Sequence, residues 1–343
     1  MTSRDLTRIA WTEGGAGTST LIWPPSSYTS IVEDQQDPIR APILQSLAQH
    51  FRVVRYDQRG FGASDRHPGS QSVTAWCEDL EAVIEASAPL SSVSLFGVSQ
   101  GAAAAIAYAT RHPDHVSRLV LHGASPYGPG HVSSERVRNH YDSFIEVTRL
   151  GWAAPNPGFR LWVTAGLIKD ASPAEFAWFD RFYPRCAEPA EAARFMEGWR
   201  EMDLRPLLSA VRTPTLVTHN SGDQMTPAKL GRTLAAGIPS AEYVELSGAS
   251  HVPRRSDGSL AELIRNLVGF LLPSPMADPF QQLSRRERDV LNKLCEGLSN
   301  CDLAESLGVK EKTVRNHVTA ILAKLKVTSR TQAVVMAMRI NKC

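Results

Sequence analysis

Short apolar runs alternate with helical stretches along the first 272 residues. The runs, rich in β-branched and apolar residues, cover 51–56, 93–96, 116–121, 215–218 and 243–246. This alternation predicts a mostly parallel β-sheet with helices on both faces. We therefore expect an α/β domain over residues 1–272.

The segment from about 131 to 200 interrupts this alternation and has a helical pattern throughout. Residues 131–199 contain 12 of the 25 aromatic residues of the chain. We interpret the segment as a helical cap over an apolar pocket, lined by Trp23 and by the cap residues Trp152, Trp162 and Trp178. Aromatic residues at helical spacing are also common in a core, and the sequence leaves both interpretations open.

Three prolines between Leu272 and Pro279 lie in a stretch without apolar periodicity, which is typical of an extended linker. We place the linker at residues 273–282. The remaining residues, 283–343, show helical patterns only, and they form a predicted second domain.

The net charge of +2 conceals an asymmetry between the two parts. From Leu283 onward there are 12 Lys and Arg residues against 6 Asp and Glu, a net charge of +6, whereas the preceding residues carry 25 against 29, a net charge of −4. Clustered positive charge attracts phosphate groups, although a charge excess is often only a solvated face.

Targeting and metal-binding signals are missing from the sequence. The longest apolar runs, such as 267–272, fall far short of the roughly 20 residues that span a bilayer. The first residues lack the apolar segment of a signal peptide. Five scattered cysteines, an odd number, indicate reduced thiols rather than a disulfide framework or a zinc site. We expect a cytoplasmic protein without a metal, a cofactor or a membrane partner.

A Gly-x-Ser-x-Gly motif, Gly97 to Gly101, lies between a predicted strand and a predicted helix. Glycines at both ends leave room for a sharp turn that projects the hydroxyl of Ser99. The backbone N–H of Gln100 would then face the position where an oxyanion forms.

This motif and its surroundings resemble the α/β-hydrolase superfamily over roughly residues 8 to 272. The stretch 57–64 is similar to the turn after an early strand of that family, and the family order is serine, acid, histidine. The resemblance implies a triad of Ser99, Asp223 and His251, in which His251 accepts the Ser99 proton and Asp223 orients the imidazole. Asp203 and Asp257 are poorer candidates for the acid because neither follows a predicted strand.

The chain departs from that family at the second oxyanion donor. Many members have His-Gly-x after the early strand, where this chain has Trp23-Pro24-Pro25-Ser26. If Trp23-Pro24 takes the place of His-Gly, the donor position falls on Pro25, which has no N–H. If Pro24-Pro25 takes it, Ser26 donates, and we favour this register because similar two-domain sequences often have Pro-Gly here. Loss of one donor costs about 2.7–4 kcal/mol of transition-state stabilisation.

Residues 281–339 resemble the LuxR/NarL-type helix-turn-helix, a four-helix DNA-binding unit. Ser284 with Glu287 fits a capped helix start, Gly297 ends that helix, and residues 311–326 correspond to the recognition helix. The resemblance implies that the exposed face of this helix enters the major groove. The alternative is a polar face that is exposed to solvent and has no role in binding. The predicted DNA contacts are Lys312, Thr313, Arg315, Asn316, Thr319, Lys324 and Arg330, with base contacts assigned to Arg315, Asn316 and Thr319 and phosphate contacts to Lys312, Lys324 and Arg330.

Members of this family bind DNA as dimers through the last helix, here 331–339. The resemblance therefore implies a homodimer with Ala333, Val334 and Ala337 at the contact, on a two-fold-related double-stranded DNA operator. Together the two resemblances predict a transcription regulator whose hydrolase-like domain binds a small apolar or aromatic effector. The alternative is a serine hydrolase that cleaves an ester, amide or lactone through an acyl-Ser99 intermediate, with the DNA-binding domain serving control.

Overall fold

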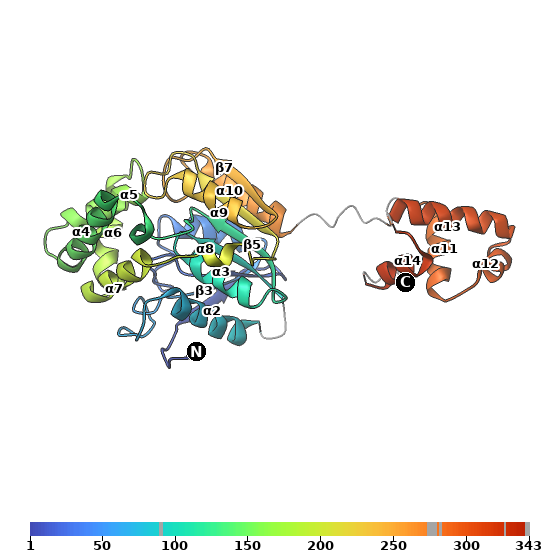
Figure 1. Cartoon of the computed structure of the whole chain (residues 1–343), viewed down its shortest axis with the longest axis horizontal. Helices are drawn as coiled ribbons and strands as arrows, with labels where there is room; N and C mark the ends of the chain where they lie inside the picture. The colour runs from blue at the N-terminus through green and yellow to red at the C-terminus, as the bar shows by residue number, and fades with distance from the viewer. Residues whose placement is uncertain (89–91, 273–279, 281–282, 326, 340–343) are drawn as a thin grey trace. The chain divides into compact units, whose positions relative to one another are not determined.

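The computed structural model describes residues 1–88, 92–272, 280, 283–325 and 327–339. The chain divides into two compact units, Met1–Leu271 and Leu272–Cys343. The predicted linker, 273–282, lies outside the described residues except for Phe280. Figure 1 shows the elements of both units.

The larger unit is built on a seven-stranded sheet in the order β1-β3-β2-β4-β5-β6-β7. Only β1 runs antiparallel to its neighbour, β3, and the other pairs are parallel. The mostly parallel sheet predicted from the sequence is therefore confirmed. The strands are β1 (Trp11–Gly14), β2 (Thr20–Trp23), β3 (Arg52–Tyr56), β4 (Val93–Val98), β5 (Val116–His122), β6 (Thr215–Asn220) and β7 (Ala241–Leu246).

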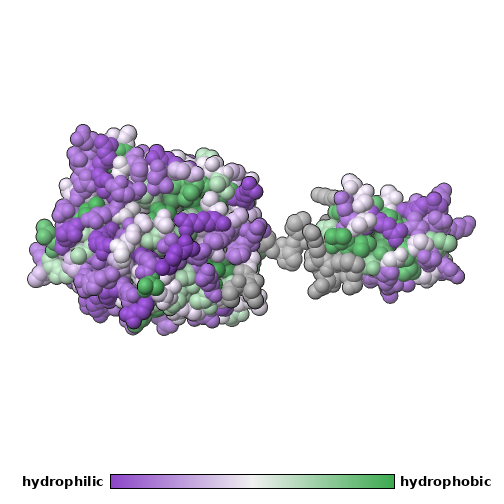
Figure 2. Space-filling model, turned by 60° about the horizontal axis from the view of Figure 1, so that its bottom comes forward, coloured by the Kyte–Doolittle hydropathy of each residue, from purple (hydrophilic) through white to green (hydrophobic). Residues whose placement is uncertain are grey.

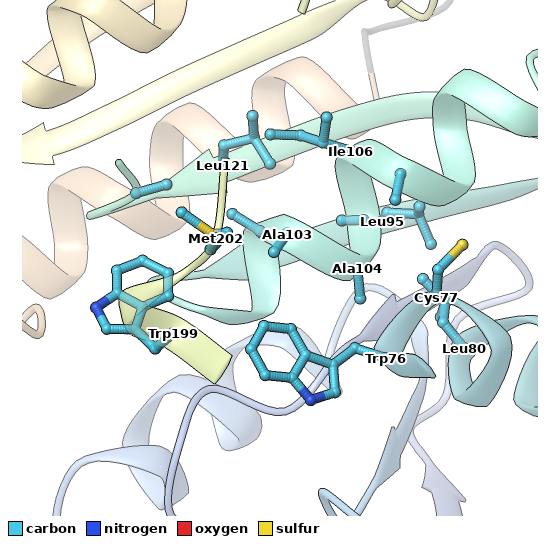
Figure 3. Close-up of a cluster of buried hydrophobic side chains, with 14 of the residues drawn as sticks. Trp76, Cys77, Leu80, Leu95, Ala103, Ala104, Ile106, Leu121, Trp199 and Met202 are labelled. Carbon is cyan, nitrogen blue, oxygen red and sulfur yellow. The ribbon is translucent and has the colours of Figure 1, made fainter. Parts of the chain in front are cut away.

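Both faces of this sheet are covered. A strand with one open face would alternate between buried and exposed residues, whereas β4 and β6 are buried at every position. The helices outside the cap are α1 (Arg40–Leu47), α2 (Val73–Ser87), α3 (Gly101–Arg111), α8 (Arg205–Leu208), α9 (Ala228–Gly237) and α10 (Ser259–Leu271). The short side chains of the alanine-rich α3 let α2 approach closely. Trp76 of α2, Ala104 of α3 and Leu95 of β4 belong to the buried cluster drawn in Figure 3.

Four helices inserted between β5 and β6 form the cap. They are α4 (Glu135–Gly151), α5 (Gly158–Leu167), α6 (Pro173–Cys186) and α7 (Pro189–Arg200), preceded by a short 3₁₀ helix (Pro129–His131). In Figure 1 these helices, drawn in green, gather at one side of the unit. A Ser172–Glu175 capping box starts α6, with each side chain accepting a backbone N–H of the other residue.

The smaller unit consists of α11 (Arg285–Cys295), α12 (Asn300–Leu307), α13 (Glu311–Leu325) and α14 (Arg330–Arg339). Ser284 and Glu287 form the predicted capping box, and Ser299 and Asp302 form another at the start of α12. The helices close around one apolar cluster, whose fully buried members include Val290, Leu303, Val314, Ile321, Ala333 and Ala337.

The burial of Ala333 and Ala337 corrects one expectation. Both were predicted to contact a second copy, but their small side chains face the apolar core of their own unit. Val334 is partly buried against the same core. Among the side chains of α14 that the structure describes, the large apolar one that is exposed is Val335, at 43%.

Two further expectations concern membrane-spanning helices and the state of the cysteines. No helix in the described parts of the chain is long and apolar enough to cross a membrane. Cys77, Cys186 and Cys301 are free thiols. Cys295 is disulfide-bonded, so the expectation of reduced thiols does not hold for every cysteine.

Candidate functional site

The turn between β4 and α3 holds Ser99 in a backbone conformation that few residues other than glycine adopt, with φ of 48°. Its N–H donates to the carbonyl of His122, at the end of the neighbouring strand, over 2.8 Å. The turn requires glycine at 97, because a Cβ there would lie 2.7 Å from the Cα of Ala102. The sequence therefore folds into a strained elbow that presents the Ser99 side chain.

Asp223 and His251 follow the next two strands, β6 and β7, and meet at the same edge of the sheet. The Nδ1–H of His251 donates to Oδ2 of Asp223 over 2.7 Å, and both side chains are buried. Oδ1 of Asp223 accepts the backbone N–H groups of Met225 and Thr226, each over 2.9 Å. Burial by itself raises the pKa of Asp223, but the neighbouring imidazole of His251 and the N–H donors outweigh it and hold the pKa well below its usual range.

The third side of the triad is open in this structure. Nε2 of His251 is buried and has no hydrogen-bond partner among the described residues, so the hydrogen bond from the Ser99 hydroxyl is not formed. Ser99 and His251 nevertheless line the same cavity. Hydrogen bonds between nucleophile and base are often long without a substrate and tighten when one binds.

A cavity of about 520 Å³ lies above the triad, between the sheet and the cap. Its apolar wall combines aliphatic side chains with eight aromatic ones, which come from both parts of the unit: Trp23, Tyr28, Phe96, Tyr141, Phe144, Trp162, Phe179 and Trp199. Figure 2 shows a mostly hydrophilic surface with hydrophobic residues in small groups. Three of the exposed apolar side chains, Val137, Trp162 and Met225, also line the cavity, which places its mouth beside them.

Two predicted pocket residues do not line this cavity. Trp152 is fully buried, and its Nε1–H donates to the carbonyl of Ala187 over 3.0 Å. Trp178 stacks on Phe182, with ring centroids 4.7 Å apart and planes at 19°. The indole of Trp152 packs on Tyr28 and Tyr183, and that of Trp178 packs on neighbours within α6, so both belong to the packing around the cap rather than to the cavity wall.

The segment after β2 lies where an oxyanion donor is needed. Ser26 and Gln100 both line the cavity, whereas Pro24 and Pro25 do not. Arg40 fixes this segment, because its guanidinium donates to the carbonyls of Ser26 and Tyr28. The donor role of Ser26 stays a prediction.

Several other cavity residues could not be predicted from the sequence. Arg40 and His122 lie on the wall although neither stands in a recognisable motif. His122 ends β5, is fully buried, and its Nδ1 lies 2.9 Å from the hydroxyl of Thr218. Burial and the nearby His219 and His251 lower the pKa of His122 to about 3, so its imidazole is neutral.

In the smaller unit, α13 carries a row of polar side chains on its free face. Lys312, Arg315, Asn316 and Thr319 are exposed, and Thr313 is partly exposed. The side chain of Arg315 is 64% exposed, and its guanidinium lies 3.5 Å from the carboxylate of Glu311 one turn earlier. Such an exposed pair contributes little to stability, so Arg315 can move to a new partner at little cost.

Lys324 and Arg330, both predicted to contact phosphate, make contacts within the unit. The ammonium of Lys324 lies 2.9 and 2.7 Å from the two carboxylate oxygens of Glu287, the capping residue of α11. The guanidinium of Arg330 donates to the carbonyl of Leu298, in the turn before α12. These two cations connect helices of the unit. Among the described residues, no cluster of His, Cys, Asp and Glu could hold a metal ion.

Comparisons with known proteins divide along the same boundary. Residues 34–253 match the alpha/beta hydrolase fold family, and residues 281–337 match the bacterial regulatory proteins of the luxR family. The AB hydrolase superfamily protein YisY of Bacillus subtilis is 29% identical over 209 residues, which cover 59% of this chain and 75% of YisY. A solved structure of a hydrolase from Pseudomonas aeruginosa PA01 is 25% identical with a TM-score of 0.63, covering 79% of this chain and 97% of that one.

The second unit has relatives of another kind. The uncharacterized transcriptional regulatory protein YhcZ of Bacillus subtilis is 46% identical over 67 residues, which are 20% of this chain and 31% of YhcZ. The match thus spans about a third of that regulator. The chain belongs to the alpha/beta hydrolase fold family and carries, after its hydrolase-like unit, a DNA-binding domain of the LuxR family of bacterial regulatory proteins.

Proposed function

We propose that this chain regulates transcription in the cytoplasm and that its cavity binds a small apolar or aromatic effector. The observation that carries the proposal is a cavity of about 520 Å³ with an apolar wall that includes eight aromatic side chains, in a chain that also has a LuxR-family domain. Cavities of this size and lining are typical of sites for small molecules.

The lining suggests how an effector lies in the cavity. Aromatic side chains such as Phe144, Trp162 and Trp199 supply apolar contact, while Ser99, Gln100 and His251 gather the polar groups at the sheet. An effector with an apolar body and one carbonyl group fits this division, with the carbonyl oxygen toward the N–H groups of Gln100 and Ser26.

Effector binding changes DNA affinity only if the effector prefers one of two states of the protein. In the proposed DNA complex, two copies place their α13 helices in successive major grooves of a two-fold-related site. Arg315 and Asn316 then address guanine and adenine, with Thr319 beside them and with Lys312 and Thr313 near the backbone. Because Ala333 and Ala337 are buried, Val335 is an apolar contact that the described part of α14 offers to a second copy.

A second candidate function is hydrolysis of an ester, amide or lactone. The 2.7 Å hydrogen bond between His251 and Asp223, together with the strained turn at Ser99, favours it. In that reaction the Ser99 oxygen attacks the carbonyl carbon while His251 Nε2 takes the hydroxyl proton. His251 then returns the proton to the leaving group, and water releases the acyl group by the same steps.

A fluorophosphonate probe on the purified full chain separates the two functions. Mass spectrometry locates any adduct, and Ser99→Ala is the control. Labelling of Ser99 would establish an activated nucleophile and support hydrolysis. Unlabelled Ser99 in protein that still binds DNA would support a binding site without turnover.

The effector proposal has its own test. Aromatic and aliphatic esters, lactones and amides are screened for a rise in the unfolding temperature of the chain, and compounds that raise it are added to DNA footprinting titrations. A compound that shifts DNA affinity equally in the wild type and in Ser99→Ala supports a sensor. If none of the compounds that bind changes DNA affinity, the sensor proposal fails.

A further inference from the structure

A second imidazole lies on the carboxylate of Asp223. His219, near the end of β6 and four residues before Asp223, is fully buried. Its Nε2 lies 2.6 Å from the carbonyl oxygen of Thr226 and 3.3 Å from Oδ2 of Asp223. Both neighbours are acceptors, so Nε2 carries the proton and donates it to the Thr226 carbonyl, with Oδ2 of Asp223 beside it.

The other ring nitrogen fixes the same tautomer. Nδ1 of His219 is buried and has no hydrogen-bond partner in the described part of the chain. It packs against α9, where a Cβ added to Gly231 would lie 2.3 Å from it. A proton on Nδ1 would be a buried donor without an acceptor, which is costly. The ring is therefore held with its proton on Nε2.

His219 joins the two ends of the loop that carries the catalytic acid. Asp223 receives N–H groups from Met225 and Thr226 on Oδ1 and from His251 on Oδ2, and Nε2 of His219 lies 3.3 Å from the same Oδ2. With donors on every side, the carboxylate cannot rotate without losing hydrogen bonds. The carbonyl of Thr226, at the far end of the loop, shares the Nε2–H of His219.

We propose that His219 is a positioning residue for the triad. Its Nε2–H ties the Thr226 carbonyl to the Asp223 carboxylate and so fixes the direction from which Oδ2 meets His251. His219 acts through Asp223, because it is not among the residues that line the cavity. The inference rests on the second candidate function, an activated Ser99.

Two substitutions separate the N–H group from the bulk of the ring. His219→Gln keeps an N–H donor at a similar reach, whereas His219→Leu keeps a similar volume and removes the donor. Fluorophosphonate labelling of the full chain is measured against probe concentration, which gives a maximal rate and a half-saturating concentration. Thermal unfolding confirms that both variants are folded.

We expect His219→Leu to lower the maximal rate on the order of tenfold to a hundredfold, the size of effect that a misplacement of about 1 Å produces. The half-saturating concentration should not change, since His219 does not line the cavity. His219→Gln should label within about threefold of the wild type, a small loss on the scale set by such misplacement. A folded Leu variant with the wild-type rate, or Gln and Leu variants that are equally slow, would overturn the proposal.

A second readout does not depend on labelling. ¹⁵N-imidazole NMR of the full chain should place the His219 proton on Nε2 and show the hydrogen-bonded Nδ1–H of His251 far downfield in the wild type and the Gln variant. In the Leu variant the downfield proton should be lost. If it persists in the Leu variant, the positioning role is refuted. If wild-type Ser99 is not labelled, catalytic competence fails, and this spectrum still decides the role of His219.

Discussion

The two units differ in where they keep their functional side chains. In the hydrolase-like unit the side chains of Asp223 and His251 are 0% and 2% exposed, and hydrogen bonds from loop backbone and neighbouring strands hold them. In the DNA-binding unit the side chain of Arg315 is 64% exposed, and the backbone of α13 alone sets its position. The site of the first unit therefore depends on packing and on buried hydrogen bonds, and that of the second depends on the placement of a helix.

The largest expected effect comes from the packing of the larger unit. Trp152→Ala should lower the free energy of unfolding by about 3–5 kcal/mol, as removal of large buried aromatic residues does. The indole is fully buried, packs on Tyr28 and Tyr183 with ring centroids 4.8 and 5.2 Å away, and donates to Ala187. Urea denaturation followed by near-ultraviolet circular dichroism measures the loss.

Trp178→Ala is the matched control for this change, because it removes the same side chain from a partly buried position on α6. It should cost less than Trp152→Ala. If both variants lost the same free energy of unfolding, burial would not determine the cost of removing an indole. The conclusion that the larger unit depends on its packing would then be weakened.

An intermediate effect is expected on the exposed face of α13. Arg315→Ala should weaken binding to an operator selected from random DNA by about 1–3 kcal/mol, because a bidentate contact to a base is lost. Footprinting titrations at fixed salt measure the affinity, and unfolding should be unchanged since the Glu311 pair is solvent-exposed.

Arg288→Ala removes the same charge from an exposed position on α11. It should weaken binding to all DNA sequences alike and leave sequence preference intact. If Arg315→Ala behaves in the same uniform way, Arg315 contacts phosphate rather than a base, and the assigned reading face is wrong.

The smallest effect concerns a helix end in the DNA-binding unit. Ser299→Ala removes the side chain that accepts the Asp302 N–H at the start of α12, so the free energy of unfolding of this unit should fall by about 1 kcal/mol. Ser306→Ala, at an exposed position inside the same helix, should cost nothing, because alanine has the higher helix propensity. Thermal unfolding of the full chain compares the two, and equal shifts would exclude a capping effect.

Motifs with fixed spacing allowed the most to be predicted from the sequence. The strands with apolar runs and the residues that follow them led to the mostly parallel sheet and to Ser99, Asp223 and His251. Parallel strands end at one edge of a sheet, so residues after different strands meet there, and the structure brings Asp223 and His251 within 2.7 Å.

The features that could not be predicted from the sequence depend on contacts between residues that are distant in sequence. The ion pair of Lys324 with Glu287, 37 residues away, is not visible in a helical pattern, and the phosphate contact of Lys324 stays a prediction. Trp152 and Trp178 were assigned to the cavity because periodicity shows that a side chain is buried but not which neighbour it faces. His219 was overlooked although its spacing of four residues from Asp223 was there to be noticed.

The loop after β6 affects which residues such a chain retains during evolution. Gln224, Met225 and Thr226 form part of the cavity wall, and the N–H groups of Met225 and Thr226 hold the carboxylate of Asp223. The acid is thus an anchor of the binding wall as well as a member of the triad. A lineage that lost catalytic turnover and kept only ligand binding would still retain Asp223, because the residue supports the cavity wall. A conserved triad acid is therefore compatible with a protein that no longer catalyses a reaction.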